Sequence, residues 1–338
     1  MDRMVAETAA RVFSGRGEDP AGLWAALEET GLTAAATPEA MGGAGFGAEE
    51  VWGLMRLSGA HAAPVPFAET LLAARLLAAA GSEPPAGRMT LAAGGRIREG
   101  RVTASLKAVP WGAAAQRVLL LAEGETGPVL ALMEIPDAAA TPAPGIGEDA
   151  AADLVFDADL PEAAAPAPNW LTPLAFRAEL ALARAAQMAG AMEASLELTL
   201  AHTSVREQFG RPLAKFQAIQ HMLAEMAGET AAAGAAVEAA AESAAEGGPV
   251  DWRAAAVAKI RAGEAAERVS AHAHQAHGAI GYTYEYDLRK VSRRLWRWRD
   301  EAGDETEWAV ALATAADAEG TPLSEWIIGP VQEVGAHV

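Results

Sequence analysis

The sequence contains no cysteine, and this absence excludes several kinds of chemistry. Without thiols the chain cannot form disulfides, use a thiolate nucleophile, or hold zinc or an iron–sulfur cluster through sulfur. Positive charge is also scarce, because 26 Lys and Arg residues face 45 Asp and Glu residues, which gives a net charge of −19. Such a charge repels nucleic-acid phosphates and anionic lipid headgroups. We therefore expect neither a nucleic-acid partner nor a membrane partner.

Long apolar runs are missing as well. The strongest candidate for a membrane span, residues 181–200, is interrupted by Arg184, Glu193 and Glu197. The first seven residues lack the cationic and apolar regions of a secretory signal. These features predict a cytoplasmic protein. Hydrophobic residues still make up 51 % of the chain, which is enough to bury a large core.

Three segments of different hydrophobic periodicity divide the chain. Residues 1–87 show helical spacing and predict an N-terminal helical domain. Residues 88–168 alternate with a period of two and predict a small β domain. Residues 169–338 return to helical spacing and predict a C-terminal helical bundle. The predicted fold class is therefore mainly α with a small central β domain.

Local signals define the elements within these segments. Short Val- and Leu-rich runs predict strands, and we expect an antiparallel sheet because no helix-length crossover fits between them. Thr172 and Pro173 are typical of a helix start, and Asp251 is placed to cap a helix that runs to about His277. An apolar stripe from Phe216 onward indicates another helix, and residues 306–318 predict a last one. Together these four helices predict a four-helix bundle.

Two motifs in the C-terminal segment resemble the acyl-CoA dehydrogenase family. The first is Val-Arg-Glu-Gln-Phe-Gly-Arg-Pro-Leu at 205–213, followed by Phe216-Gln217. The second is Gln-Ala-His-Gly-Ala-Ile-Gly-Tyr at 275–282. The resemblance implies FAD as cofactor, an acyl-CoA substrate that is oxidised to its α,β-enoyl form, and a dimer or tetramer. It also implies that two subunits each supply one of these motifs to a single FAD.

The resemblance assigns cofactor roles to individual residues in these motifs. Arg206 carries a planar cationic fork that suits the FAD pyrophosphate, and Phe209 with Gly210 is expected to end its helix. Gln217 would reach the adenine or ribityl group. The glycines of the second motif would let the backbone approach the ligand. The predicted cofactor-binding residues are Arg206, Phe209, Gln217, Gln275, Gly278 and Gly281.

The glutamate base of the family has no clear counterpart here. Two positions can supply it in the family, and they fall on Ala302 and Leu180 in this chain. Glu301 adjoins the first position and is the catalytic candidate. Glu179 adjoins the second position and is the alternative, although one residue on a helix turns a side chain by about 100°. Whether the chain is itself an enzyme is therefore left open.

The β segment also departs from the family pattern. Residues 89–95 lack the family's flavin-binding stretch, and Trp111 stands where a hydroxyl donor is expected. The resemblance therefore points to the short, catalytically depleted subunit of a heteromeric, two-gene acyl-CoA dehydrogenase. Its partner would be a longer homologue that acts on bulky acyl-CoAs such as those with steroid side chains. The alternative is a flavin-free homo-oligomer with a structural or acyl-CoA-binding role.

Other motifs carry weaker functional hypotheses. His272, His274 and His277 lack a nearby carboxylate that would complete a metal site, so we predict no metal. The segment 289–299 places six cations around Trp296 and Trp298, a pattern that can bind nucleic acid. In so acidic a chain, these cations are expected to pair with Glu or Asp instead.

Overall fold

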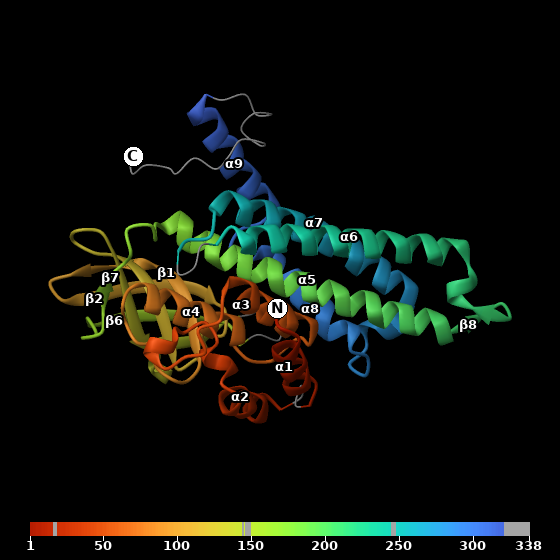
Figure 1. Ribbon diagram of the computed structural model, residues 1–338, viewed down its shortest axis with the longest axis horizontal. Helices are drawn as coiled ribbons and strands as arrows, with labels where there is room; N and C mark the ends of the chain where they lie inside the picture. The colour runs from red at the N-terminus through yellow and green to blue at the C-terminus, as the bar shows by residue number, and fades with distance from the viewer. Residues whose placement is uncertain (16–18, 144, 146–149, 245–247, 321–338) are drawn as a thin grey trace.

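The computed structural model describes residues 1–15, 19–143, 145, 150–244 and 248–320 (Figure 1). The last part of the predicted C-terminal domain, residues 321–338, lies outside this description. In the described part of the chain, no helix combines the length and apolar character needed to cross a membrane.

Four α-helices precede the sheet in the described N-terminal region: α1 (Arg3–Gly15), α2 (Pro20–Glu29), α3 (Ala48–Ala60) and α4 (Phe67–Ala79). Two short 3₁₀ turns, η1 (Leu32–Ala34) and η2 (Glu39–Met41), join α2 to α3. Helix α4 is buried on nearly all sides, including its acidic residue Glu69. It packs on β1 and α5, so it connects the β region with the C-terminal helices.

A seven-stranded sheet follows these helices, in the spatial order β5-β6-β2-β1-β3-β4-β7. The sheet lies at one end of the molecule in Figure 1. Its apolar side chains contact the helices on one side and form a second small core on the other. The strands are β1 (Met89–Arg98), β2 (Arg101–Val109), β3 (Arg117–Glu123), β4 (Pro128–Glu134), β5 (Ala140–Pro142), β6 (Ala152–Asp159) and β7 (Ala165–Pro166).

The prediction of an antiparallel sheet was wrong for one pair, because β1 and β3 are parallel. Strand β2 returns antiparallel to β1 and therefore ends at the edge where β1 begins. Residues 110–116 then need only pass that edge to start β3 on the other side of β1. A parallel pair normally needs a long crossover. Here the intervening antiparallel strand brings the chain back, so a short turn is enough.

Five α-helices follow the sheet among the described residues: α5 (Pro173–Val205), α6 (Gln217–Glu242), α7 (Trp252–His277), α8 (Leu288–Asp300) and α9 (Glu305–Glu319). Figure 1 shows α5, α6 and α7 side by side along the molecule. The Thr172 hydroxyl accepts from the Ala175 amide and the Asp251 carboxylate accepts from the Arg253 amide, so both predicted caps are confirmed.

The sequence prediction of four C-terminal helices omitted α8. The six cations of this segment suggested a surface, but Leu288, Val291, Leu295 and Trp298 form a buried apolar stripe at helical spacing. Helix α8 packs against α5 and α7, whereas the predicted fourth helix, α9, contacts α7. The four mutually packed helices are therefore α5 to α8.

The backbones of α3 and α5 touch where two glycines meet the opposing helix. A Cβ on Gly59 would lie 2.0 Å from the carbonyl oxygen of Gln187, and a Cβ on Gly190 would lie 1.9 Å from that of Arg56. No side chain can occupy either position without separating the helices. The N-terminal helices are thus in direct backbone contact with the bundle.

We expect Gly190→Ala to destabilise the chain by about 3 kcal/mol, because the new methyl group overlaps backbone that cannot move independently. Gly228→Ala is the matched control, since Gly228 lies in α6 with open space around the position of a Cβ. That change should stabilise the helix by about 0.5–1 kcal/mol. Urea unfolding of both variants tests the expectation, and equal effects would contradict it.

Candidate functional site

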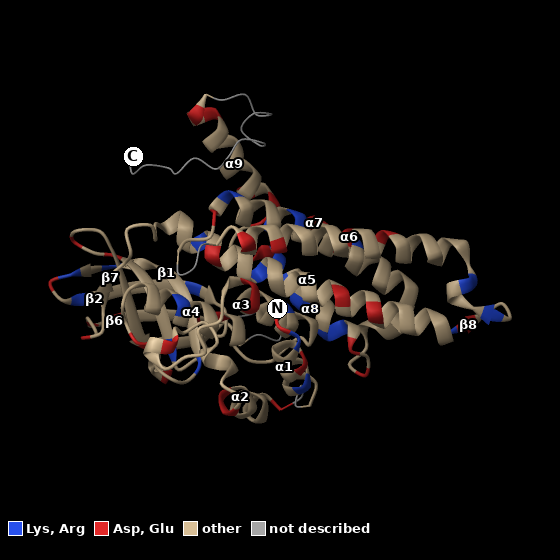
Figure 2. Ribbon diagram, viewed as in Figure 1, with Lys and Arg blue, Asp and Glu red and all other residues tan. Residues whose placement is uncertain are grey.

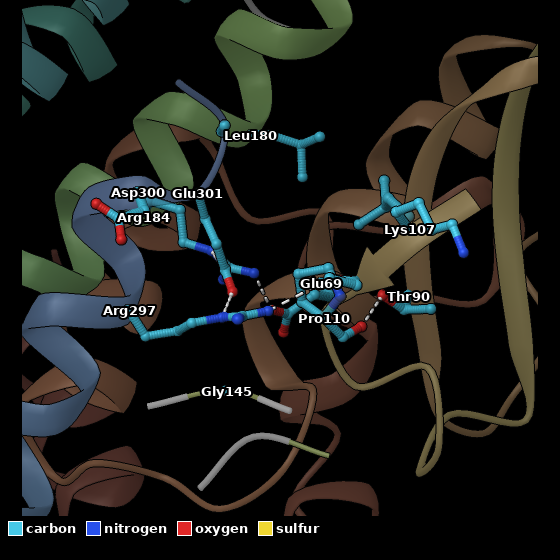
Figure 3. A pocket seen from close by; sticks show the side chains of 13 residues that line it. Glu69, Thr90, Lys107, Pro110, Gly145, Leu180, Arg184, Arg297, Asp300 and Glu301 are labelled. Carbon is cyan, nitrogen blue, oxygen red and sulfur yellow. Dashed lines mark hydrogen bonds and ion pairs between the residues drawn. The ribbon is translucent and has the colours of Figure 1, made fainter. Parts of the chain in front are cut away.

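A cavity of about 520 Å³ lies where α4, α5, the end of α8 and the sheet meet (Figure 3). It is bordered by three acidic and three basic side chains, together with apolar residues from α5 and from β1 and the end of β2. The side chains that line it include Glu69, Thr90, Lys107, Pro110, Leu180, Arg184, Arg297, Asp300, Glu301 and Ala302.

Arg184 is the centre of a buried charge network in this cavity. Its Nε lies 2.6 Å from Glu301 Oε2, and its Nη2 lies 2.6 Å from Glu69 Oε1. Its Nη1 donates to the side-chain oxygen of Gln187 at 2.6 Å. Arg184 is 2 % exposed and Glu69 is 3 % exposed, so the two charges depend on each other for compensation.

Arg297 extends the network to the sheet. Its Nε donates to Glu301 Oε1 at 2.5 Å, and its Nη2 donates to the carbonyl of Ala108 at 3.3 Å. Each oxygen of Glu301 therefore accepts from a different guanidinium, as Figure 3 shows. The network joins α4, α5, α8 and β2. Glu301, the predicted catalytic candidate, lines the cavity, but both its oxygens are already engaged.

The two positions that could carry a base both line the cavity without an ionisable group. They are Leu180 on α5 and Ala302 in the turn between α8 and α9. Ala302 has a left-handed backbone with a φ of 59°. Its carbonyl accepts from Arg177 Nε at 3.2 Å and from Trp308 Nε1 at 3.0 Å. The backbone at Ala302 is thus held in a strained conformation, although the side chain of this residue is only a methyl group.

Lys259 supports the same turn from α7. Its ammonium donates to the carbonyls of Arg299 at 2.6 Å and Gly303 at 2.8 Å. The side chain is almost completely buried, and this burial lowers the pKa of Lys259 to about 8. Sequence reasoning missed this residue, since a lysine inside an Ala-rich helix gives no signal of its partners.

The alternative base, Glu179, does not line the cavity. Its Oε1 lies 2.7 Å from Arg75 Nη1 and accepts from the Val250 amide at 3.2 Å. Burial raises the pKa of Glu179, and Arg75 opposes that rise. The side chain therefore joins α5 to α4 and to the start of α7, away from the two base positions.

The aromatic and hydroxyl groups beside the cavity are also engaged. Trp111 is 5 % exposed and has a φ of 58°, and the Arg294 guanidinium lies 5.7 Å from its ring. The Thr90 hydroxyl donates to the Pro110 carbonyl at 2.6 Å. The Thr90 hydroxyl is therefore not free to donate to a flavin ring, and the charge network lines the same space.

A second group of predicted residues lies at the far end of the bundle. Helix α5 ends at Val205, and a short hairpin follows, formed by β8 (Glu207–Gln208) and β9 (Arg211–Pro212). Phe209 and Gly210 have φ values of 54° and 78° and form its two-residue turn. The expectation that they end the helix was wrong. They form a hairpin tip, and Phe209 is 93 % exposed there.

Both family motifs are found at this end of a single chain. The rings of His202 on α5 and His277 on α7 stack with centroids 4.3 Å apart, which brings the ends of the two helices together. Arg206, Gln217 and Gln275 are exposed. Gly278 has a φ of 63° and open space where a Cβ would stand. The assignment of the two motifs to different subunits stays a prediction.

Gly281 differs from the other predicted cofactor residues. It is buried, and a Cβ at this position would lie 3.1 Å from His274 Nδ1 and 3.1 Å from the His277 Cβ. Its lack of a side chain therefore serves packing of the turn after α7.

The end of the bundle is exposed and carries local positive charge, and both properties suit the binding of a diphosphate. The segment 206–215 contains Arg206, Arg211 and Lys215 but only one acid, Glu207, in a chain of net charge −19. Figure 2 shows basic positions on and beside the hairpin at this end. Arginine forks and exposed backbone amides are the groups that bind phosphates.

The remaining candidate motifs are engaged within the chain. In α8, Arg294 is buried and donates to the Ala63 carbonyl, and Arg299 pairs with Glu267 and Glu305. The contacts of Arg299 agree with the expected pairing to Glu or Asp, whereas Arg294 donates to a backbone carbonyl. His274 Nε2 lies 2.9 Å from the Ser292 hydroxyl, and His272 Nε2 lies 2.7 Å from Glu225.

Comparison with known proteins gives a consistent result. The family profile described as acyl-CoA dehydrogenase, C-terminal domain, matches residues 177–299. The acyl-CoA dehydrogenase IpdE2 of Mycolicibacterium smegmatis (strain ATCC 700084 / mc(2)155) is 30 % identical over 287 residues, which cover 82 % of this chain and 82 % of that protein. This chain belongs to the acyl-CoA dehydrogenase family, and the resemblance inferred from its two motifs is confirmed.

Solved structures show the same fold. The Tcur3481-Tcur3483 steroid ACAD superposes with a TM-score of 0.80 at 28 % identity, over 94 % of this chain and 98 % of that one. The ChsE4-ChsE5 complex from Mycobacterium tuberculosis superposes with a TM-score of 0.82 at 23 % identity, over 95 % of this chain and 97 % of that one. The predicted fold class is thereby confirmed, with the corrections to the sheet and the bundle described above.

We expect Arg184→Met to destabilise the chain by about 3–5 kcal/mol, because it leaves the carboxylates of Glu69 and Glu301 buried with reduced compensation. Arg101→Met is the matched control, since Arg101 lies on the exposed face of β2 and pairs with Asp157 and Asp159 of the neighbouring strand β6. That change should cost at most about 1 kcal/mol. Chemical denaturation distinguishes the two, and a small effect of Arg184→Met would show that the network is not essential to folding.

The lowered pKa of Lys259 predicts a pH-dependent stability. Between about pH 8 and its ordinary value of 10.5, the unfolded chain keeps the Lys259 proton and the folded chain releases it. The free energy of unfolding of the wild type minus that of Lys259→Met should therefore increase with pH in this window. The increase is up to about 1.4 kcal/mol per pH unit. Unfolding of both proteins at pH 8, 9 and 10 measures the slope. A difference that falls with pH would contradict the assignment.

Proposed function

We propose that this chain is the catalytically depleted subunit of a heteromeric, FAD-dependent acyl-CoA dehydrogenase. In this arrangement it contributes the far end of its bundle to the FAD of a longer homologue. Both motifs of this one chain would then contact the cofactor, in place of the expected one motif from each subunit. The observation that carries the proposal is a contrast between its two sites. The cavity that would face the reacting groups is lined by paired charges, whereas the residues that would hold the diphosphate are exposed.

Glu301, the base candidate in the cavity, is not free to accept a proton. A general base must reach the proton that it removes, and it needs an oxygen that is available to accept it. Glu301 has both oxygens bound to guanidinium groups, and the positions of Ala302 and Leu180 carry no carboxylate. When bound, FAD accepts the hydride in α,β-dehydrogenation. The proposal places the flavin ring and the base in the partner subunit.

The far end of the bundle supplies groups for binding. Arg206 would pair with the diphosphate, and the amide after His277 would approach it because Gly278 adds no side chain. Gln217 at the start of α6 and Gln275 near the end of α7 provide amide groups for the adenosine portion. Phe209 presents an exposed ring that would pack on the cofactor or the partner.

The relatives support a substrate class. The structure that shares 28 % identity is a steroid ACAD, and bulky steroid acyl-CoA thioesters are accordingly the proposed substrates of the complex. The assembly would be a dimer or tetramer that includes the longer homologue, located in the cytoplasm.

The second candidate is a flavin-free homo-oligomer with a structural or acyl-CoA-binding role. The same buried network favours it, since a cavity crossed by ion pairs needs no cofactor to be stable. It differs from the first candidate in making no use of Arg206. The FAD content of this chain, purified with the longer homologue, distinguishes the two candidate functions.

We expect the chain to co-purify with a co-expressed longer acyl-CoA dehydrogenase homologue as a yellow complex. Arg206→Gln should lower the FAD affinity of that complex about tenfold, because one charge-assisted contact to the diphosphate is lost. Arg268→Gln is the control, since Arg268 pairs with Glu229 on the surface between α6 and α7. Absorbance at the flavin maximum and equilibrium dialysis measure the effect.

Two results would contradict the proposal. A colourless complex would favour the flavin-free candidate. Loss of turnover in Glu301→Gln, with flavin content and free energy of unfolding both unchanged, would assign the base to this chain.

A further inference from the structure

The His202 ring lies between the two motifs at the end of the bundle. His202 precedes Arg206 by four residues, so both belong to the same face at the end of α5. Its ring stacks on His277, the residue directly before Gly278. A diphosphate held between the Arg206 guanidinium and the Gly278 backbone would therefore lie beside this imidazole.

The ring of His202 is held in place by stacking, and its two nitrogens are free to bind a ligand. Besides the stack on His277, it meets the Tyr286 ring edge-on with centroids 6.0 Å apart. The residue is half-buried, and among the described residues neither of its ring nitrogens has a hydrogen-bond partner. His277, by contrast, donates from Nδ1 to the Ala273 carbonyl at 2.8 Å and faces the Tyr286 hydroxyl with Nε2 at 3.1 Å.

The surroundings of His202 keep it neutral in the free chain. Burial, His277 and Arg206 all lower the pKa of His202. The charged or titratable groups around the stack are Arg206 on α5, His277 and His274 on α7, and Tyr286 and Asp287 before α8. Burial also lowers the pKa of His277 and of His274. A ligand anion would thus introduce the compensating charge that favours the imidazolium.

We propose that His202 is a further binding residue for the cofactor diphosphate and that its imidazole takes up a proton when the diphosphate binds. The inference rests on the proposed function, because that function places the diphosphate at this end of the bundle. Protonation turns both ring nitrogens of His202 into donors, and the new cation adds to Arg206. By linkage, cofactor binding becomes tighter as the pH falls.

The test measures FAD binding to the complex of the full chain with its longer homologue after removal of flavin. Both phosphates of FAD are esterified, so the probe itself keeps its charge between pH 6 and pH 8. Titration calorimetry should show an affinity about fivefold to tenfold tighter at pH 6 than at pH 8. Runs in two buffers of different ionisation enthalpy should show an uptake of about half a proton at pH 7.

Two variants of His202 separate titration from structure. His202→Phe keeps a ring to stack on His277, and His202→Gln keeps a donor that does not titrate. Both should lose the proton uptake and most of the pH dependence, and the Gln variant should retain more affinity at pH 6. His221→Phe is the control, because His221 is exposed on α6, and it should behave as the wild type.

The outcomes distinguish this inference from the proposed function. If the wild-type complex binds FAD and His202→Phe shows the same proton uptake, His202 is not a diphosphate ligand and the proposed function stands. If Arg206→Gln and the wild type bind FAD equally, the diphosphate lies elsewhere and both proposals fail. If only the His202 variants lose the pH dependence, the inference is supported.

Discussion

The pairing of Arg184 with Glu69 and Glu301 is the interaction on which the interior of this molecule depends. Three charges from α4, α5 and the turn after α8 meet where solvent is almost excluded. Each charge alone would be costly to bury, and together they are compensated. Because Arg297 extends the set to Ala108 on β2, the same interaction fixes the sheet against the helices. The network therefore has an architectural role in the place where a family member would be expected to do chemistry.

This arrangement explains why the two ends of the molecule differ. Around the network, strained residues such as Trp111 and Ala302 keep left-handed backbones, and Lys259 supports the turn that holds Ala302. The turn at Ala302 is thus fixed by its neighbours, although its own side chain carries no ionisable group. At the opposite end, the cations of the hairpin region have no comparable interior partners, and their surroundings suit an anionic ligand.

Much of the fold could be predicted from periodicity, because amphipathic helices and alternating strands leave direct traces in the sequence. Helix α8 could not, since its cations masked a stripe of four apolar residues. The parallel pairing of β1 and β3 was missed because it depends on where β2 ends in space. Arg206 and Gly278 were proposed as site residues from their motifs, and their role in cofactor binding stays a prediction. Glu69 and Arg184 were not proposed, because residues far apart in sequence pair only once the helices pack; their one signal was charge within apolar helices.

The glycine contact between α3 and α5 has a consequence for how the molecule can change shape. Helices separated by side chains can slide, since rotamers adjust to a new register. Gly59 and Gly190 leave no such layer, and main chain rests on main chain. The first helical layer and the long helices must therefore move as one body.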